Sequence, residues 1–207
     1  MPTSNRPGYA YELDATGQKI AAVFGIRLDL PAFDPNSEVS PAQVSPVVRL
    51  TPGGERKCVL ARWGLAPYQS AESNIGPRRF TARAETVASG PAFRAAFMQR
   101  RCLIPATGFF ELAGSRAKRL RHRLALPGGK VMAIAGVWDI WHDRAGTRGD
   151  TYTIITSEPT QYHRTVIARM PVIIKPKDFE AWLAEPRIDL LTPYDGKLVI
   201  RQTASFD

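Results

Sequence analysis

The chain has 207 residues, a length that fits one domain and can bury a substantial hydrophobic core. Its composition, 44% hydrophobic and 23% charged residues, is that of an ordinary soluble protein, and no apolar run approaches membrane-spanning length. The formal net charge of +9 is unusual and favours a polyanionic partner, with nucleic acid ahead of a membrane surface.

Arginines outnumber lysines heavily in this chain, and the planar guanidinium group suits phosphate better than an ammonium group does. An Arg-rich, high-GC genome would produce the same bias. Cys58 and Cys102 lie in apolar surroundings and are expected to be buried thiols, and no spacing predicts a metal site. The residues after Met1 contain no apolar signal segment, so we expect a cytosolic protein.

The N-terminal third is expected to contain a helix, an irregular segment and a hairpin. Apolar residues at helical spacing predict a helix within Leu13–Ile26, interrupted by Gly17. Leu30–Pro46 is rich in Pro, Asp, Asn and Ser and is expected to be irregular and too polar for the core. Val47–Leu50 and Cys58–Trp63 flank a Pro-Gly-Gly turn and predict a hairpin.

The rest of the chain is predicted to be mostly strand. A loop is expected over Gln69–Phe80, and helices in the second half of Glu85–Ala96, over Thr160–Ile167 and over Asp178–Leu183. The predicted strands are Cys102–Ile104, Gly108–Leu112, Arg121–Leu126, Val131–Trp138, Thr151–Thr156 and Pro171–Ile174. Short strands without an alternating βαβ order predict a compact α+β fold of mostly antiparallel sheet with a few short helices. Because no GxGxxG or P-loop occurs, no nucleotide cofactor is expected.

Four sequence blocks carry a resemblance to a known family. They are Ala61–Tyr68, Thr81–Thr86, Arg100–Glu111 and Arg169–Ile174. With Trp138 and Trp182, their order and spacing resemble the SOS response-associated peptidase (SRAP) family of abasic-site processing proteins. The resemblance covers roughly residues 38–185 of an expected single SRAP-like domain, and segments 1–37 and 186–207 match weakly.

The resemblance implies a compact, mostly β fold with a basic groove for single-stranded DNA, in a monomer of the DNA damage response. The groove ends at a pocket around the mature N-terminus. Family members expose an N-terminal cysteine whose amine condenses with the aldehyde of an abasic site and whose thiol closes a thiazolidine. An Asn, a Glu and a His surround that adduct, an arrangement of amine nucleophile and acid/base groups.

In this chain, the family's acidic position and its groove-lining positions are still occupied by suitable residues. Glu111 falls on the acidic position, although a carboxylate there could also be a solvated strand end. The residues expected to contact DNA by stacking or by binding phosphate are Trp63, Tyr68, Arg78, Arg79, Arg83, Arg101 and Arg169. The alternatives are core packing for Trp63 and an ion pair with Glu85 or Glu111 for Arg83.

Three family positions are replaced. No cysteine precedes Cys58, so the thiol of the crosslink is absent. Thr81 stands where the family has Asn, and Ile167–Ala168 stands where it has His–Asp before Arg-Met-Pro. The adduct chemistry is therefore expected to be changed or lost.

Two residues are candidate replacements in catalysis. Pro2 would become the N-terminus after removal of Met1, and its secondary amine can form an iminium with an aldehyde, although a frayed tail is the alternative. His163 lies one helical turn before Ile167 and could take the place of the lost histidine, or face solvent. The run Arg116–Arg123 is the densest basic cluster and is expected either to follow phosphates or to be simply solvated.

Three hypotheses follow from the sequence. The first is a divergent abasic-site processing protein that acts on single-stranded DNA as a Schiff-base lyase through Pro2 and Glu111. The second is a non-catalytic pseudoenzyme that binds single-stranded DNA. The third, a peptidase, is the weakest, because no Ser/His/Asp arrangement is evident and proteolysis in the family concerns its own N-terminus.

Overall fold

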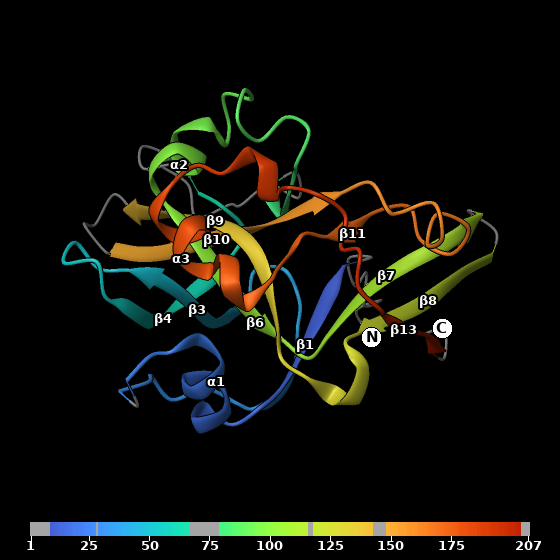
Figure 1. Ribbon diagram of the computed structural model, residues 1–207, viewed down its shortest axis with the longest axis horizontal. Helices are drawn as coiled ribbons and strands as arrows, with labels where there is room; N and C mark the ends of the chain where they lie inside the picture. The colour runs from blue at the N-terminus through green and yellow to red at the C-terminus, as the bar shows by residue number, and fades with distance from the viewer. Residues whose placement is uncertain (1–8, 28, 67–78, 116–117, 143–147, 204–207) are drawn as a thin grey trace, which may run out of the picture.

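The structure is a computed structural model that describes residues 9–27, 29–66, 79–115, 118–142 and 148–203. Two sheets and three short α-helices make up these residues (Figure 1). The helices are α1 (Gly17–Phe24), α2 (Arg94–Gln99) and α3 (Phe179–Ala184). Short 3-10 turns occur at Pro127–Gly129, Pro176–Asp178 and Ile188–Leu190.

The smaller sheet is antiparallel and carries both terminal strands of the described chain. Its order is β13 (Val199–Thr203), β8 (Lys118–Ala125), β7 (Gly108–Ser115), β1 (Ala10–Asp14) and β2 (Asn36–Val39). The long β7–β8 hairpin extends to the right in Figure 1. This sheet therefore brings the N-terminal strand and the C-terminal strand to opposite sides of one hairpin.

The larger sheet curves into a closed ring. Its order is β11 (Met170–Pro171), β10 (Arg148–Ser157), β4 (Arg56–Trp63), β3 (Val44–Leu50), β6 (Arg101–Ala106), β9 (Met132–His142) and β12 (Ile173–Ile174). A further pairing of β9 with β10 closes the ring. The pairings of β10 with β4 and with β5 (Thr81–Arg83) are parallel, so the sheet is mixed.

The core lies inside this ring and beneath the smaller sheet. Trp63 is fully buried, its ring centroid lies 5.3 Å from that of Tyr11, and its Nε1 donates to the carbonyl of Phe80 at 2.7 Å. The hydroxyls of Tyr11 and Tyr152 are 2.6 Å apart. These contacts join the smaller sheet, through β1, to strands β4 and β10 of the ring.

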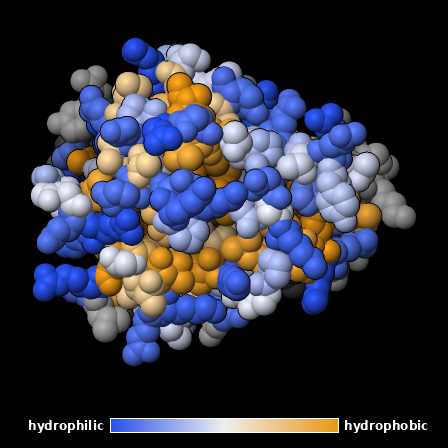
Figure 2. Space-filling model, viewed as in Figure 1, coloured by the Kyte–Doolittle hydropathy of each residue, from blue (hydrophilic) through white to orange (hydrophobic). Residues whose placement is uncertain are grey.

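Close packing inside the ring depends on one glycine. A Cβ on Gly136 of β9 would lie 2.4 Å from Cδ1 of Ile104 and 2.8 Å from the carbonyl oxygen of Thr153. These atoms belong to β6 and β10, the two strands that pair with β9. Hydrophilic side chains cover most of the face shown in Figure 2, with hydrophobic ones in patches between them.

Most predicted elements are confirmed, including the α+β class, the β3–β4 hairpin, α2, α3 and the strands from β6 to β10. The helix predicted within Leu13–Ile26 begins only at Gly17, because Leu13 belongs to β1 and Thr16 caps the helix. The irregular segment Leu30–Pro46 in fact contains β2 and the start of β3. Thr160–Ile167 forms hydrogen-bonded turns rather than a helix, and the C-terminal strand β13 was not predicted.

None of the helices among the described residues has the length and apolar character needed to cross a membrane.

Candidate functional site

Glu111 is a buried carboxyl group on the inner face of the smaller sheet. Strand alternation places it on the same face as Phe109, and the two residues are 2% and 1% exposed. Its Oε1 accepts a hydrogen bond of 2.8 Å from the backbone N–H of Arg169, while its buried Oε2 has no hydrogen-bond partner among the described residues. Glu111 is therefore not a solvated strand end.

Burial also changes the acidity of this group. It raises the pKa of Glu111 to about 7, and hydrogen bonds from the backbone N–H groups of Arg169 and Ala168 act in the opposite direction. A carboxyl group whose pKa lies near neutral pH can both donate and accept a proton under ordinary conditions, which is the requirement for general acid/base catalysis.

Arg169 fixes the backbone that holds Glu111. Its guanidinium group forms a two-point ion pair with Glu85 at 3.1 and 2.9 Å and donates to the carbonyl of Thr156 at 2.5 Å. The same guanidinium group lowers the pKa of the Glu85 carboxyl below its usual value. Arg169 was predicted to bind phosphate, but its side chain is 17% exposed and is committed to these partners. The structure gives it an anchoring role instead.

Tyr9 lies near Glu111, and Arg83 lies near Tyr9. Burial and the charge of Glu111 raise the pKa of Tyr9, and the positive charges of Arg169 and Arg83 lower it. Arg83 itself is exposed at the end of β5, and the ion pair with Glu85 that the sequence allowed is made by Arg169 instead. Arg83 forms no ion pair in the described part of the chain, so it is free to meet a ligand phosphate.

The remaining catalytic candidates are not joined to Glu111. Thr81 is half-buried on β5, opposite Ile154. His163 was weighed as a solvent-facing residue, but it is 5% exposed, and its Nδ1 lies 2.8 Å from the hydroxyl of Thr160. No hydrogen bond of the described residues links His163 to Glu111. Ile167, at the family's histidine position, packs in a hydrophobic cluster with Leu124 and Met170.

Two predictions of DNA contact are wrong. Trp63 is 0% exposed inside the core, so neither face of its indole is available to a base. Arg101 is 5% exposed, and its guanidinium group donates to backbone carbonyls at the ends of α2 and α3, those of Phe97, Trp182, Leu183 and Ala184. Both side chains serve the fold.

Of the four remaining predicted site residues, one lies among the described residues and three do not. Arg79 is described and half-buried, and its carbonyl accepts a hydrogen bond from the backbone N–H of Leu65. Pro2, Tyr68 and Arg78 lie outside the described residues.

In the basic run Arg116–Arg123, Arg121 and Arg123 point away from Glu111. Arg121 pairs with Glu38 at 2.6 Å, and Arg123 pairs with Glu12 at 2.7 Å. Both are on the sheet face opposite to Glu111, since they alternate with His122, which stands directly across from Glu111. His122 was read from the sequence only as part of this run. A histidine between Leu120 and Leu124 at strand spacing was the signal that it points inward.

Neither cysteine is suited to act as a nucleophile. Cys58 and Cys102 are both buried and free, as predicted, and burial raises the pKa of the Cys58 thiol to about 12. The pKa of Cys102 is raised even further by the same cause. Over the described residues, no three His, Cys, Asp or Glu side chains lie close enough together to hold a metal ion.

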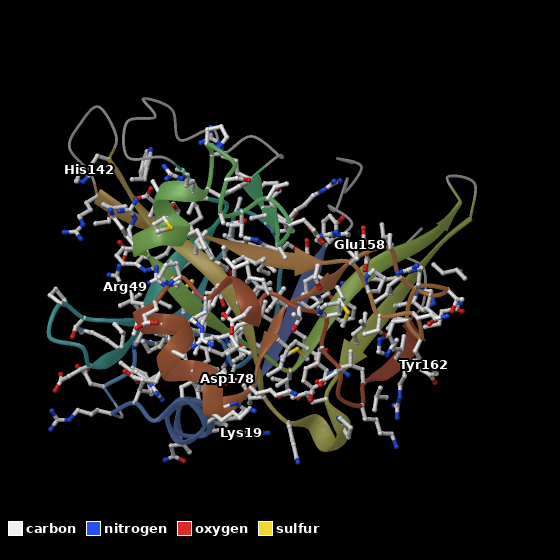
Figure 3. All side chains as sticks on the ribbon, turned by 45° about the horizontal axis from the view of Figure 1, so that its top comes forward. Lys19, Arg49, His142, Glu158, Tyr162 and Asp178 are labelled. Carbon is white, nitrogen blue, oxygen red and sulfur yellow. The ribbon has the colours of Figure 1, made fainter. Side chains whose placement is uncertain are left out.

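Glu158, whose backbone N–H donates to Glu85 at 3.2 Å, is on the same side as Tyr162, whereas Arg49 and His142 lie on the other side (Figure 3). The candidate site thus combines a buried acid of raised pKa, an Arg169 held by its ion pair, and an exposed Arg83 near Tyr9.

Comparisons with known proteins show the family of the chain. A family model described as SOS response associated peptidase (SRAP) matches residues 10–204, a range that extends beyond residues 38–185 on both sides. The chain is 32% identical to abasic site processing protein YoaM of Bacillus subtilis over 182 residues, which cover 82% of this chain and 80% of that protein. It is 25% identical to abasic site processing protein HMCES of Rattus norvegicus, over 81% of this chain and 60% of that protein.

Solved structures resemble the fold closely. A protein of Bacteroides thetaiotaomicron superposes with a TM-score of 0.81 and 25% identity, covering 94% of this chain and 91% of that chain. A protein of Bordetella bronchiseptica gives a TM-score of 0.81 at 24% identity, covering 95% of this chain and 99% of that chain.

Proposed function

This chain belongs to the SOS response associated peptidase (SRAP) family, and on that premise we propose that it processes abasic sites in single-stranded DNA, with Glu111 as its proton-transfer residue. The proposal places the protein in the DNA damage response. Its support is the name that its relatives share and the chemistry that the Glu111 site offers.

The observation that supports the proposal most strongly is the burial and hydrogen bonding of the Glu111 carboxyl group. The carboxyl is 2% exposed, one oxygen is held by the N–H of Arg169, the other has no partner in the described residues, and its pKa is raised to about 7. An unpartnered buried carboxyl oxygen costs stability, so its presence needs a reason. Proton transfer to a bound substrate supplies that reason.

The reaction that we propose uses an amine of the chain rather than a thiol. The nitrogen of Pro2, freed by removal of Met1, adds to the aldehyde carbon of the opened abasic site. Glu111 protonates the resulting hydroxyl, which leaves as water and yields an iminium. Loss of a proton from the adjacent sugar carbon then expels the 3′-phosphate. This route needs no thiol.

Trapping with borohydride tests this proposal. A single-stranded oligonucleotide with one abasic site is incubated with the protein and sodium borohydride, which reduces an iminium to a stable amine. We expect a covalent adduct whose mass equals that of the protein without Met1 plus the oligonucleotide, less the water lost on iminium formation and plus the two hydrogens of the reduction, mapped to Pro2 by peptide sequencing. Glu111→Gln should lower its rate of formation by about a hundredfold.

The controls separate chemistry from binding. Glu55→Gln, an exposed carboxyl on the β3–β4 turn, should trap at the rate of the unaltered protein. Absence of any adduct, or an adduct unaffected when the N-terminal amine is acetylated, contradicts the proposed reaction.

A second candidate function is binding of single-stranded DNA without turnover. It is favoured by Ile167, which is 1% exposed in a hydrophobic cluster at the position where the family has its histidine. In that case the exposed Arg83 remains a phosphate contact, and Arg83→Glu should weaken binding and reduce the salt dependence of the affinity by about one phosphate contact. Arg27→Glu, an exposed arginine on the loop after α1, is the control of equal charge change. Equal affinities for the two variants would exclude this surface.

A further inference from the structure

A row of polar side chains crosses the inner face of the smaller sheet at Glu111. The register pairs Glu111 of β7 with His122 of β8, and His122 with Gln202 of β13. Tyr9 precedes Ala10, which pairs with Phe110, so Tyr9 takes the next place opposite Glu111. Because residues directly opposite each other share a face, the row runs Tyr9, Glu111, His122, Gln202.

Two neighbours in this row carry buried polar atoms without partners. Oε2 of Glu111 and Nδ1 of His122 are both buried, and neither has a hydrogen-bond partner in the part of the chain that the structure describes. The Cβ atoms of directly opposite residues lie about 4.5–5.5 Å apart, within reach of a carboxyl and an imidazole after a small side-chain rotation. One shared proton satisfies both atoms, as O–H to nitrogen or as N–H to carboxylate.

Among the described residues near His122, no other charged side chain offers the same match. Arg121 and Arg123, its neighbours along β8, point to the opposite face and are paired with Glu38 and Glu12. His163 already has the Thr160 hydroxyl 2.8 Å from its Nδ1. His122 thus stands directly across from Glu111, and its Nδ1 and the Oε2 of Glu111 both lack a hydrogen-bond partner among the described residues.

We propose that His122 is a positioning residue that shares one proton with Glu111, so that the two side chains form a coupled acid/base pair. The role of this pair in DNA chemistry rests on the proposed function, but the shared proton is a property of the free protein. Glu111 gives the shared proton to the departing hydroxyl, which leaves as water, so the pair is left without its proton. Partly exposed His122 then takes up one proton from solvent, and Nδ1 and the carboxylate share it again.

The side chains around the pair differ in charge between its two sides. Arg169 faces Glu111 from the segment before β11 and Tyr9 faces it from the start of β1, while the charge of Arg83 on β5 acts on Tyr9. On the β13 side, the residue opposite His122 is the uncharged Gln202. The pair lies between a cationic side, where a phosphate chain would approach, and a neutral side.

Titration of the free protein by NMR tests the pair without DNA. Protein with ¹³C-labelled Glu and His side chains is followed from pH 4 to pH 10, and the Glu111 carboxyl signal is assigned by its loss in Glu111→Gln. We expect the Glu111 and His122 signals to show the same two midpoints. In His122→Gln the Glu111 signal should follow one step, with a midpoint about one pH unit higher because the neighbouring imidazolium is lost.

The matched control is Gln202→Ala, which removes the other neighbour of His122 and should leave the Glu111 curve unchanged. Independent single-step curves for Glu111 and His122 in the unaltered protein overturn the proposal, a result that does not require any variant to fold. An unchanged Glu111 midpoint in His122→Gln overturns it as well.

The trapping assay separates this inference from the proposed function. With a coupled pair, His122→Gln should slow adduct formation about tenfold and shift its pH optimum upward, and added imidazole should restore part of the rate. Coupled titrations without any adduct would refute the proposed function and leave the pair standing. Adduct formation with uncoupled titrations would refute the pair and leave the function standing.

Discussion

The backbone N–H of Arg169 donates to Oε1 of Glu111 at 2.8 Å, while the guanidinium group of Arg169 is held by Glu85 and Thr156. The position of the buried acid is therefore set by the main chain of a residue whose side chain is fixed elsewhere. An ion pair at the surface thus helps to position a buried carboxyl group that it does not touch.

Glu85→Gln should separate this positioning effect from stability. Because the Glu85 side chain is 44% exposed, its loss should change the free energy of unfolding by less than about 1 kcal/mol. The Arg169 backbone should become less well fixed, and the rate of borohydride trapping should fall about tenfold. Single-turnover trapping and urea unfolding measure the two effects.

Glu158→Gln is the control for Glu85→Gln, because Glu158 is an exposed neighbour with the same charge. It should leave both quantities unchanged. Equal losses of rate in the two variants would show that net charge, and not the clamp on Arg169, governs the site.

The raised pKa of Glu111 makes stability depend on pH in a definite direction. The folded pKa is about 7 and the usual value is 4.5, so the folded protein binds the proton more tightly than the unfolded chain does. The stability that goes with the bound proton is fully present below about pH 4.5 and is lost as pH rises through 7. The loss amounts to about 3 kcal/mol at 1.36 kcal/mol per pKa unit.

Glu111→Gln removes this dependence, because glutamine does not titrate. Relative to the unaltered protein, the variant should gain about 3 kcal/mol of stability between pH 4.5 and pH 8, measured by urea unfolding at several pH values. Glu55→Gln, which replaces an exposed carboxyl, should show no such gain. A difference between variant and parent that is constant over this range contradicts the burial argument.

Arg101 should matter for stability and not for DNA. Arg101→Met keeps the apolar stem but leaves carbonyls at the ends of α2 and α3 without their donor, at a cost of about 3 kcal/mol or more. Arg94→Met, an exposed change on α2, should cost less than about 0.5 kcal/mol. Thermal unfolding and binding of single-stranded DNA by the folded fraction measure the outcome. Weakened binding at unchanged stability would restore the groove role predicted from the sequence.

Local patterns in the sequence predicted the elements that local interactions decide. The β3–β4 hairpin follows from two alternating runs around a Pro-Gly-Gly turn, and α3 follows from an apolar face that buries Phe179, Trp182 and Leu183. The strands β2 and β13 were missed because they are short and lie at the edges of the smaller sheet. Their partners, β1 and β8, are set by tertiary packing.

The sequence predicted only part of the site, because tertiary packing decides the surroundings of its residues. Glu111 was found from its sequence block, but the environment that raises its pKa includes the segment with Arg169, which is distant along the chain. Trp63 was assigned to a groove, and the rings of Tyr11 and Tyr152 place it in the core instead. His122 lies in a basic run, and the charge of that run carries no information about strand alternation, which places the imidazole on the same face as Glu111.

Gly136 makes the closed ring of the larger sheet sensitive to a single methyl group. A Cβ at this position would lie 2.4 Å from Cδ1 of Ile104 and 2.8 Å from the Thr153 carbonyl oxygen, and backbone cannot move aside as a side-chain end can. Gly136→Ala should therefore destabilise the protein by about 1–3 kcal/mol through overpacking. Gly149→Ala is the matched control, because its Cβ would meet Trp141 at an ordinary 3.5 Å. Urea unfolding should show a lowered midpoint for the first variant only, and equal midpoints would mean that β9 can shift within the ring without cost.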